Sequence, residues 1–249
     1  MKFPLDYMEW LIIGLMIGFC AVLALVANHF RIFDRGGCLA ALALGILVSL
    51  TGMYQWLSLL FILMVAVYTS TRFRFREKES KGLQEGKSGC RGYKSILANG
   101  GVACAIAFST LFFPHKVFMF AFPFLVAVAS ANSDVFASEI GGISNNAYLI
   151  TNLEKVKPGT NGGVSWLGQG AAFAGSLLIS IAGYLLFHLP LKLVLPAALL
   201  GFVGCQIDSV LGATIEGRRL TRKGPVLGKE GVNLTSIFLT SVLAFGLIA

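Results

Sequence analysis

Long apolar segments constrain the fold of this chain more than any other feature of its sequence. We read eight of them, with expected spans 10–27, 38–54, 56–71, 96–113, 116–131, 166–187, 191–211 and 232–248. A helix needs about 20 apolar residues to cross a bilayer, and it satisfies its own backbone groups in lipid. With 56% hydrophobic and 13% charged residues, the chain is predicted to be an all-α, polytopic membrane protein with about eight transmembrane helices.

The basic residues indicate how these helices are oriented. Of the 20 Lys and Arg residues, 17 fall in four alternate breaks between apolar segments, at 28–37, 72–95, 132–165 and 212–231. Short cytoplasmic loops of membrane proteins are enriched in Lys and Arg. We therefore expect these four breaks to face the cytoplasm and both the N- and C-termini to lie outside.

The length suits one integral membrane domain, 1–249, with no separate soluble domain. Within it we expect a three-helix part, 1–71, and a five-helix part, 72–249, that carries the cytoplasmic loops 72–95, 132–165 and 212–231. The polar, Gly-rich stretch 76–92 predicts a mobile loop. The basic residues sit in short loops that also hold acids, so their partners are expected to be membrane lipids and not nucleic acid. The sequence does not indicate an oligomeric state.

Carboxylates stand at the ends of two apolar segments. Asp134 and Glu139 lie in Ser133–Gly142 (SDVFASEIGG), and Asp208 lies near the end of the seventh segment. Acids at this depth are costly and usually functional, and Mg²⁺ prefers a few carboxylates together with substrate phosphates. We predict Asp134, Glu139 and Asp208 as metal ligands. The alternatives are helix capping for the first two and an ion pair with a loop arginine for Asp208.

A glycine-rich stretch, KVKPGTNGGVS (residues 155–165), precedes the sixth apolar segment. Glycines let the backbone approach a ligand closely, and N–H groups leading into a helix attract phosphate. The candidate nucleotide-binding residues are Lys155, Gly159, Thr160, Asn161, Gly162, Gly163 and Ser165, with Lys157 in a catalytic role. No Gly-Lys-Ser/Thr follows, so the stretch is not a Walker A motif. The alternative is a turn with small-residue helix packing.

A basic cluster follows the third apolar segment. It contains Arg72 and Arg74 in TRFRFREK, then Arg91 and Asn99 further along the chain. Arginine forks match phosphate geometry, so we predict these four residues as ligands of a substrate phosphate. The alternative is that the cluster only sets the topology and binds lipid headgroups.

Together these stretches resemble an integral membrane family that contains plant phytyl-phosphate kinase and animal transmembrane protein 19. The matching elements are TRFRFREK, Arg91 to Asn99-Gly100, SDVFASEIG, ITNLEKVKPGTNGGVSWLG and DSVLGATIEG, in this order from Thr71 to Asn233. The resemblance implies a multi-pass enzyme that transfers a phosphoryl group from CTP or another nucleoside triphosphate, such as ATP, to an isoprenyl monophosphate. We assign Asp134, Glu139, Asp208 and Lys157 as the catalytic residues, with Mg²⁺ as the expected cofactor.

Two other functions stay open at this point. A CTP-dependent lipid-phosphate cytidylyltransferase would use the same kinds of substrate and differ only in the phosphorus atom that is attacked. A small-molecule transporter would also have small residues and a buried acid in its helices. The sequence shows no transit peptide, which favours a prokaryotic cell membrane over an organelle.

Overall fold

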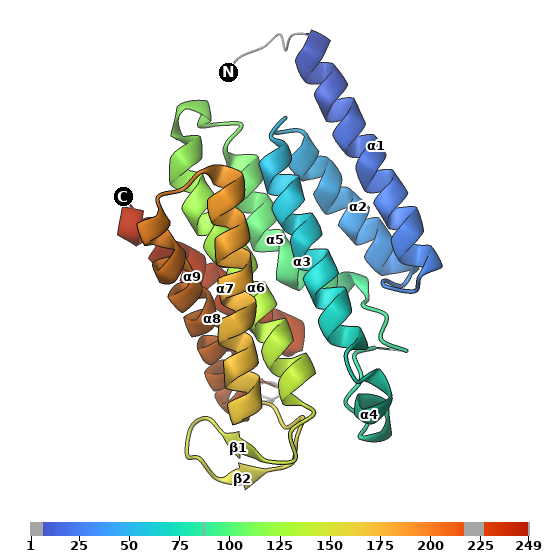
Figure 1. Cartoon of the computed structure of the whole chain (residues 1–249), viewed down its shortest axis with the longest axis vertical. Coiled ribbons are helices and arrows are strands. Elements are labelled where there is room, and N and C mark those ends of the chain that lie inside the picture. The colour runs from blue at the N-terminus through green and yellow to red at the C-terminus, as the bar shows by residue number, and fades with distance from the viewer. Residues whose placement is uncertain (1–6, 87, 217–226, 249) are drawn as a thin grey trace.

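The computed structural model describes residues 7–86, 88–216 and 227–248, and it is mostly helical (Figure 1). Its elements are α1 (Tyr7–His29), α2 (Arg35–Ser49), α3 (Tyr54–Arg72), α4 (Phe75–Ser80), α5 (Tyr93–Ser109), α6 (Val117–Gly141), β1 (Ala147–Leu149), β2 (Lys155–Val156), β3 (Gly163–Val164), α7 (Trp166–Phe187), α8 (Val194–Thr214) and α9 (Lys229–Ile248). The predicted fold class, an all-α polytopic membrane protein, is confirmed.

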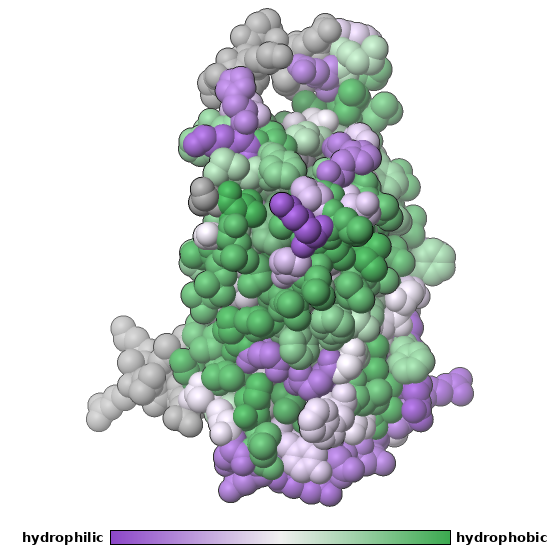
Figure 2. Space-filling view, turned by 60° about the vertical axis from the view of Figure 1, so that its left-hand side comes forward, coloured by the Kyte–Doolittle hydropathy of each residue, from purple (hydrophilic) through white to green (hydrophobic). Residues whose placement is uncertain are grey.

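Each of the eight expected apolar segments is a helix. Six helices of the described chain are long and apolar enough to cross a membrane: α1, α3, α6, α7, α8 and α9. The other two are shorter, since α2 has 15 residues and α5 has 17. Figure 2 shows a largely apolar surface over the middle of the molecule, with hydrophilic residues gathered towards its ends. The count of eight crossings and the location of the termini remain predictions.

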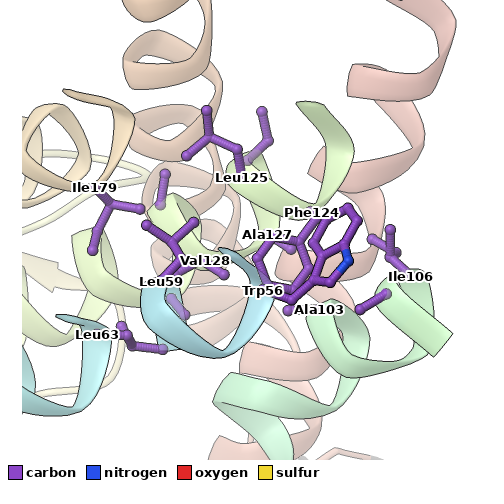
Figure 3. Packing of buried hydrophobic residues seen from close by; sticks show 14 of the residues in the cluster. Trp56, Leu59, Leu63, Ala103, Ile106, Phe124, Leu125, Ala127, Val128 and Ile179 are labelled. Atoms are coloured by element: carbon purple, nitrogen blue, oxygen red, sulfur yellow. The ribbon is translucent and has the colours of Figure 1, made fainter. Parts of the chain in front are cut away.

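Helix α6 forms the centre of the bundle. Thirteen consecutive residues, 121–133, are buried, because α3, α5, α7, α8 and α9 all pack against this helix. The ring centroids of Trp56 of α3 and Phe124 of α6 lie 4.6 Å apart (Figure 3). The ring centroid of Phe187 of α7 lies 4.8 Å from that of Trp56. The core is therefore built around a single helix, whose C-terminal end reaches the candidate site.

Small residues let the helices around α6 approach closely. A Cβ atom added at Gly201 of α8 would collide with Ser176 and Ala129, and one at Gly204 would collide with Ser130. Close approach of backbones through Gly, Ala and Ser is the usual way in which membrane helices pack, because lipid provides no hydrophobic force between them.

The structure corrects the expected end of the fifth span and the start of loop 132–165. Helix α6 continues to Gly141, ten residues beyond the expected end at 131. The first two polar residues of this extension bond to α7: Asn132 donates to the Gly175 carbonyl at 2.9 Å, and Ser133 donates to the Ala172 carbonyl at 2.9 Å. The SDVFASEIG motif is consequently helical and lies inside the bundle.

The loops at the α4 and β-sheet end carry more structure than the sequence predicts. The stretch expected to be a mobile loop, 76–92, includes most of α4, and the Lys78 side chain is only 1% exposed. After α6, the chain folds into a small antiparallel sheet with strand order β2-β1-β3. Breaks 28–37, 72–95 and 132–165 lie at this end (Figure 1). Four basic residues of the last break, Arg218, Arg219, Arg222 and Lys223, lie outside the described residues, as does Lys2.

Candidate functional site

A polar cavity of about 330 Å³ opens where α6, α8 and α9 meet the loops that bear the small sheet. Asp134 and Ser138 of α6, Asp208 and Gly212 of α8, and Asn233 of α9 contribute to its walls. The glycine-rich segment 158–165 covers one side. Three motifs that are far apart in the sequence therefore share one cavity, because the ends of their helices meet there.

The structure brings the predicted acids Asp134 and Asp208 together. They are close enough to interact directly across the α6–α8 interface. Helix α9 supplies a partner to each: Asn233 Nδ2 donates to Asp134 Oδ2 at 3.2 Å, and Ser236 Oγ donates to Asp208 Oδ1 at 3.3 Å. Two neighbouring carboxylates at the edge of a membrane need a cation or a proton to offset their repulsion.

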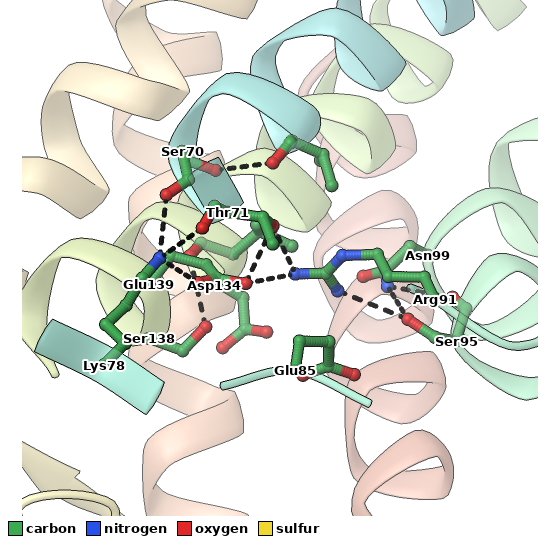
Figure 4. A network of polar contacts seen from close by, with 12 residues as sticks. Ser70, Thr71, Lys78, Glu85, Arg91, Ser95, Asn99, Asp134, Ser138 and Glu139 are labelled. Atoms are coloured by element: carbon green, nitrogen blue, oxygen red, sulfur yellow. Dashed lines mark hydrogen bonds and ion pairs between the residues drawn. The ribbon is translucent and has the colours of Figure 1, made fainter. Parts of the chain in front are cut away.

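Glu139, the third predicted metal ligand, has other partners. Its carboxylate pairs with Lys78 Nζ at 2.5 Å and with Arg91 Nη2 at 2.8 Å, and it accepts a hydrogen bond from Thr71 Oγ1 at 2.8 Å (Figure 4). All four side chains are buried. Within the described residues there is no group of three or more His, Cys, Asp or Glu side chains that could hold a metal. The three acids predicted as ligands are thus not gathered into one cluster.

The Glu139 network carries one more positive charge than negative charge, since two cations surround one carboxylate. Lys78 Nζ also donates to the carbonyls of Ser70 and Thr71, at 3.0 and 2.8 Å. Arg91 still has capacity to bind: within the described part of the chain its buried Nε has no hydrogen-bond partner. The guanidinium is therefore held by Glu139, and among the described residues its Nε–H remains free to donate.

Of the four predicted phosphate ligands, Arg91 and Asn99 lie together and Arg72 and Arg74 lie elsewhere. Arg91 Nη1 donates to Ser95 Oγ at 3.3 Å, and Asn99 Nδ2 donates to the Ser95 carbonyl at 2.9 Å. Arg72 stacks over the rings of Tyr68 and Phe75, at 5.4 and 5.5 Å. Arg74 is half exposed and pairs with Glu77. Aromatic stacking and a surface ion pair thus hold these two arginines away from the described lining of the cavity.

The glycine-rich segment lines the cavity with backbone. Gly159 and Gly162 have φ angles of +84° and +70°, a conformation that favours glycine. Gly162 also lies so close to α8 that an added Cβ would collide with Ala213 and with the Ser209 carbonyl. Ser165 caps α7 by accepting a hydrogen bond from Gly168 N at 3.1 Å, so the positive end of that helix faces the cavity.

The two lysines of this segment lie apart from the cavity. Lys155 and Lys157 are exposed, and both fall outside the described residues that line it. The pairing of β2 with β1, which sets Lys155 opposite Tyr148, places them on the outer edge of the sheet. Thr160 and Asn161, in contrast, belong to the lining.

Sequence reasoning missed the acid and base that close the cavity, Glu85 and Lys229. Their side chains form an ion pair at 2.9 Å, and Lys229 is the one cation among the described lining residues. Burial opposes ionisation of Glu85, but Lys229 and Arg91 outweigh it and hold the pKa of this carboxyl below its usual value. Nearby Glu216 behaves oppositely: burial, with the charges of Asp134 and Glu230, raises its pKa. A lone Glu in one loop and a lone Lys in another carry no spacing signal that could link them.

Comparison with known proteins gives relatives but no solved structure, since none matches significantly. An uncharacterized membrane protein of Methanocaldococcus jannaschii is 32% identical over 240 residues, which cover 96% of this chain and 95% of the relative. An uncharacterized membrane protein of Synechocystis is 32% identical over 72% of this chain and 68% of its own length. The chloroplastic protein VTE6 of Arabidopsis thaliana is 27% identical over 88% of this chain and 69% of its own length.

The match to a family model covers almost all of the helical bundle. It runs over residues 18–241 and includes every motif that contributes to the polar cavity. The protein therefore belongs to the integral membrane protein family DUF92.

Proposed function

We propose that the protein is a membrane-embedded kinase that transfers a phosphoryl group from a nucleoside triphosphate to an isoprenyl monophosphate. The acceptor would be of the phytyl or geranylgeranyl type, and the donor would be CTP or ATP. One observation carries this proposal: the paired carboxylates Asp134 and Asp208 line the same polar cavity as the glycine-rich segment, beside the buried guanidinium of Arg91.

The polar cavity suits the donor. Its volume of about 330 Å³ falls at the lower end of the range of small-molecule sites, roughly 300–1,000 Å³. The backbone of 159–163 and the capped start of α7 present positive dipole ends to an anion. Lys229 adds a full positive charge within the same lining. These features together favour a polyphosphate over a neutral ligand.

The carboxylate pair fits Mg²⁺, which is commonly bound through one or two carboxylates plus substrate phosphates. Asp134 and Asp208 would hold the ion, and Glu139 is excluded from our proposal because three donors already occupy its carboxylate. When bound, the ion would neutralise charge on the triphosphate and orient its terminal phosphoryl group. The protein itself contributes position and charge.

The transfer needs no strong general base. An ionised oxygen of the acceptor monophosphate attacks the γ-phosphorus, the bond from that phosphorus to the β–γ bridging oxygen breaks, and its electron pair leaves with the nucleoside diphosphate. Arg91 would hold the acceptor phosphate, since its buried Nε–H donor has no partner in the described chain. Asn99 would contribute through its Nδ2 amide, which also donates to the Ser95 carbonyl. The ion pair with Glu139 would orient the Arg91 guanidinium before the substrate binds.

The relatives support the same reaction class. Three of the five motifs that resemble plant phytyl-phosphate kinase contribute to the cavity, and the chain is similar to the chloroplastic VTE6 protein along 238 residues. Other similar proteins are uncharacterized membrane proteins, so the acceptor and the donor of this chain are matters for experiment.

The test is a product analysis with the purified protein in lipid nanodiscs. Mg²⁺, CTP or ATP, and geranylgeranyl or phytyl monophosphate are supplied, and the products are identified by mass spectrometry. We expect prenyl diphosphate and nucleoside diphosphate. The Asp134→Asn and Asp208→Asn variants should lose at least 100-fold in rate, because a carboxylate of the proposed Mg²⁺ site is removed.

Glu154→Gln provides a matched control, since Glu154 is exposed in the turn between β1 and β2, and it should keep the wild-type rate. A CDP-lipid with release of pyrophosphate would instead identify a cytidylyltransferase. No turnover with any pair of substrates would refute the kinase and direct attention to transport.

A further inference from the structure

A second cavity, with apolar walls, lies between α1, α2, α3 and α5. Its volume is about 140 Å³, and it extends along α3 from Leu57 to Val67. At 1.5 Å per residue these ten positions correspond to a length of about 15 Å. Cys20, Ala24 and Ala27 of α1 and Ala41 of α2 form the facing walls. A narrow apolar slot parallel to the helices is shaped for a hydrocarbon chain.

One end of this apolar pocket is polar. Apart from two cysteines, its polar lining residues within the described chain are Arg91, just before α5, and Ser95 and Asn99, in the first two turns of α5. Arg91 is 7% exposed, and neither its Nε nor Asn99 Oδ1 has a hydrogen-bond partner in the described residues. Buried polar atoms of this kind are costly unless a ligand or water satisfies them, and of these two only the Arg91 Nε–H donor suits a phosphate.

The polar end of the apolar pocket leads towards the polar cavity. Arg91 and Ser95 also line a small space of about 20 Å³ that is shared with Asp134, Ser138, Lys229 and Asn233. Asp134, Lys229 and Asn233 belong in turn to the wall of the polar cavity. Figure 4 shows Arg91 between Asn99 on one side and Asp134 on the other. A ligand with its chain in the apolar pocket would therefore place its headgroup beside the carboxylate pair.

We propose that the apolar pocket binds the isoprenoid chain of a lipid monophosphate, with its phosphate at Arg91, beside Asn99. This inference rests on the proposed kinase function and adds to it the location of the acceptor chain. The positive charge of Arg91, with its Nε–H donor that is unpartnered in the described residues, complements a phosphate at this end. The pocket volume, less than half that of the polar cavity, accommodates part of one chain and not the two chains of a diacyl lipid.

Helix α1 provides a route from the bilayer into the pocket. It is the least buried of the six candidate spans, and it packs mainly against α2 (Figure 1). Among the described residues, one aromatic pair joins α1 to α3: the ring centroids of Phe19 and Phe61 lie 5.8 Å apart. Because α1 makes few packing contacts, a lipid substrate can enter the pocket laterally from the bilayer. The distal part of a long chain would then remain in the membrane.

The direct test is photocrosslinking in nanodiscs without nucleotide. The probe is geranylgeranyl monophosphate with a diazirine near its second isoprene unit, and the labelled peptides are mapped by mass spectrometry. We expect labels on α1, α3 or α5 at the residues that line the apolar pocket. Excess unlabelled geranylgeranyl monophosphate should remove the labels at least tenfold more effectively than phosphatidic acid.

A matched pair of substitutions on α2 tests the pocket by function. Ala41→Phe fills the pocket, whereas Ala43→Phe adds the same ring on the exposed side of the same helix. We expect Ala41→Phe to raise the KM for geranylgeranyl monophosphate at least tenfold and to leave the KM for dimethylallyl monophosphate within twofold. Ala43→Phe should change neither. Thermal unfolding of both variants checks that the fold is intact.

The outcomes separate this inference from the proposed function. Labels in the pocket without any turnover would support the binding site and refute the kinase. Turnover with labels confined to the outer surfaces of other helices would keep the kinase and overturn the pocket. Equal competition by phosphatidic acid would also overturn it, because the pocket would then be a general lipid site. If Ala41→Phe fails to fold, the crosslinking result decides alone.

Discussion

At the scale of single residues, Glu139 joins three parts of the chain through one buried carboxylate. Thr71 ends α3, Lys78 belongs to α4 and Arg91 precedes α5, and all three contact Glu139 of α6. We expect Glu139→Gln to cost about 3–5 kcal/mol of folding stability, because two buried cations would lose their counter-charge. The measurement is the midpoint of thermal unfolding in detergent. Glu77→Gln is the control, since its surface pairs with Arg74 and Lys81 contribute about 0–1 kcal/mol. Equal shifts in the two variants would contradict this account of the network.

Asp134 is expected to behave in the opposite way. Its neutralisation removes repulsion from Asp208, so Asp134→Asn should be at least as stable as the wild type without divalent cations. Mg²⁺ should raise the unfolding midpoint of the wild type, by the equivalent of about 2.7 kcal/mol at 100 times its dissociation constant, and should leave the variant unchanged. Glu154→Gln should retain the full Mg²⁺ response. A normal response of Asp134→Asn would rule out a metal site at this carboxylate.

At the scale of elements, the glycine-rich segment depends on its contact with α8. Gly162→Ala would strain a residue at φ +70° and push the segment away from Ala213. We therefore expect the folding stability to fall by about 1–3 kcal/mol and the KM for nucleotide to rise at least fivefold. Gly170→Ala is the matched control on α7, where an added Cβ meets no atom within 4 Å. That change should be neutral or stabilise the helix by about 0.5–1 kcal/mol. Unfolding midpoints and nucleotide titrations measure both effects, and a neutral Gly162→Ala would show that the segment tolerates displacement.

At the scale of the whole molecule, the charge distribution predicts the orientation in the membrane. Alkaline phosphatase fused after Ala249 should be active, because the C-terminus is expected outside, and the same enzyme inserted at Glu154 should be inactive. A fluorescent protein that matures only in the cytoplasm should give the reverse pattern at the two sites. The expected topology has three crossings, α7, α8 and α9, between the two sites, which places the sites on opposite sides of the membrane. Activity of both phosphatase fusions, or of neither, would place them on the same side and contradict this topology.

Much of the fold could be predicted because hydropathy acts locally. The eight apolar segments all became helices, and only the ends were misjudged, as at α6, where hydrogen bonds from Asn132 and Ser133 to α7 extend the helix. The small sheet was missed because strands of two or three residues, such as β2 and β3, are too short for a periodic signal. The isolated β-bridge between Phe33 and Arg91, which are 58 positions apart, likewise has no signal in the linear sequence.

The sequence alone determined that this protein is a helical membrane protein with its acids, glycines and basic residues concentrated at one end. That much follows from composition and from the positions of charges along the chain. The tertiary structure decided which acid meets which partner. Asp134 and Glu139 are five residues apart on α6, so they face different directions: one meets Asp208 and the other meets Lys78 and Arg91. Only packing between distant helices could also create the apolar pocket and the Glu85–Lys229 pair, because each depends on residues from separate parts of the chain.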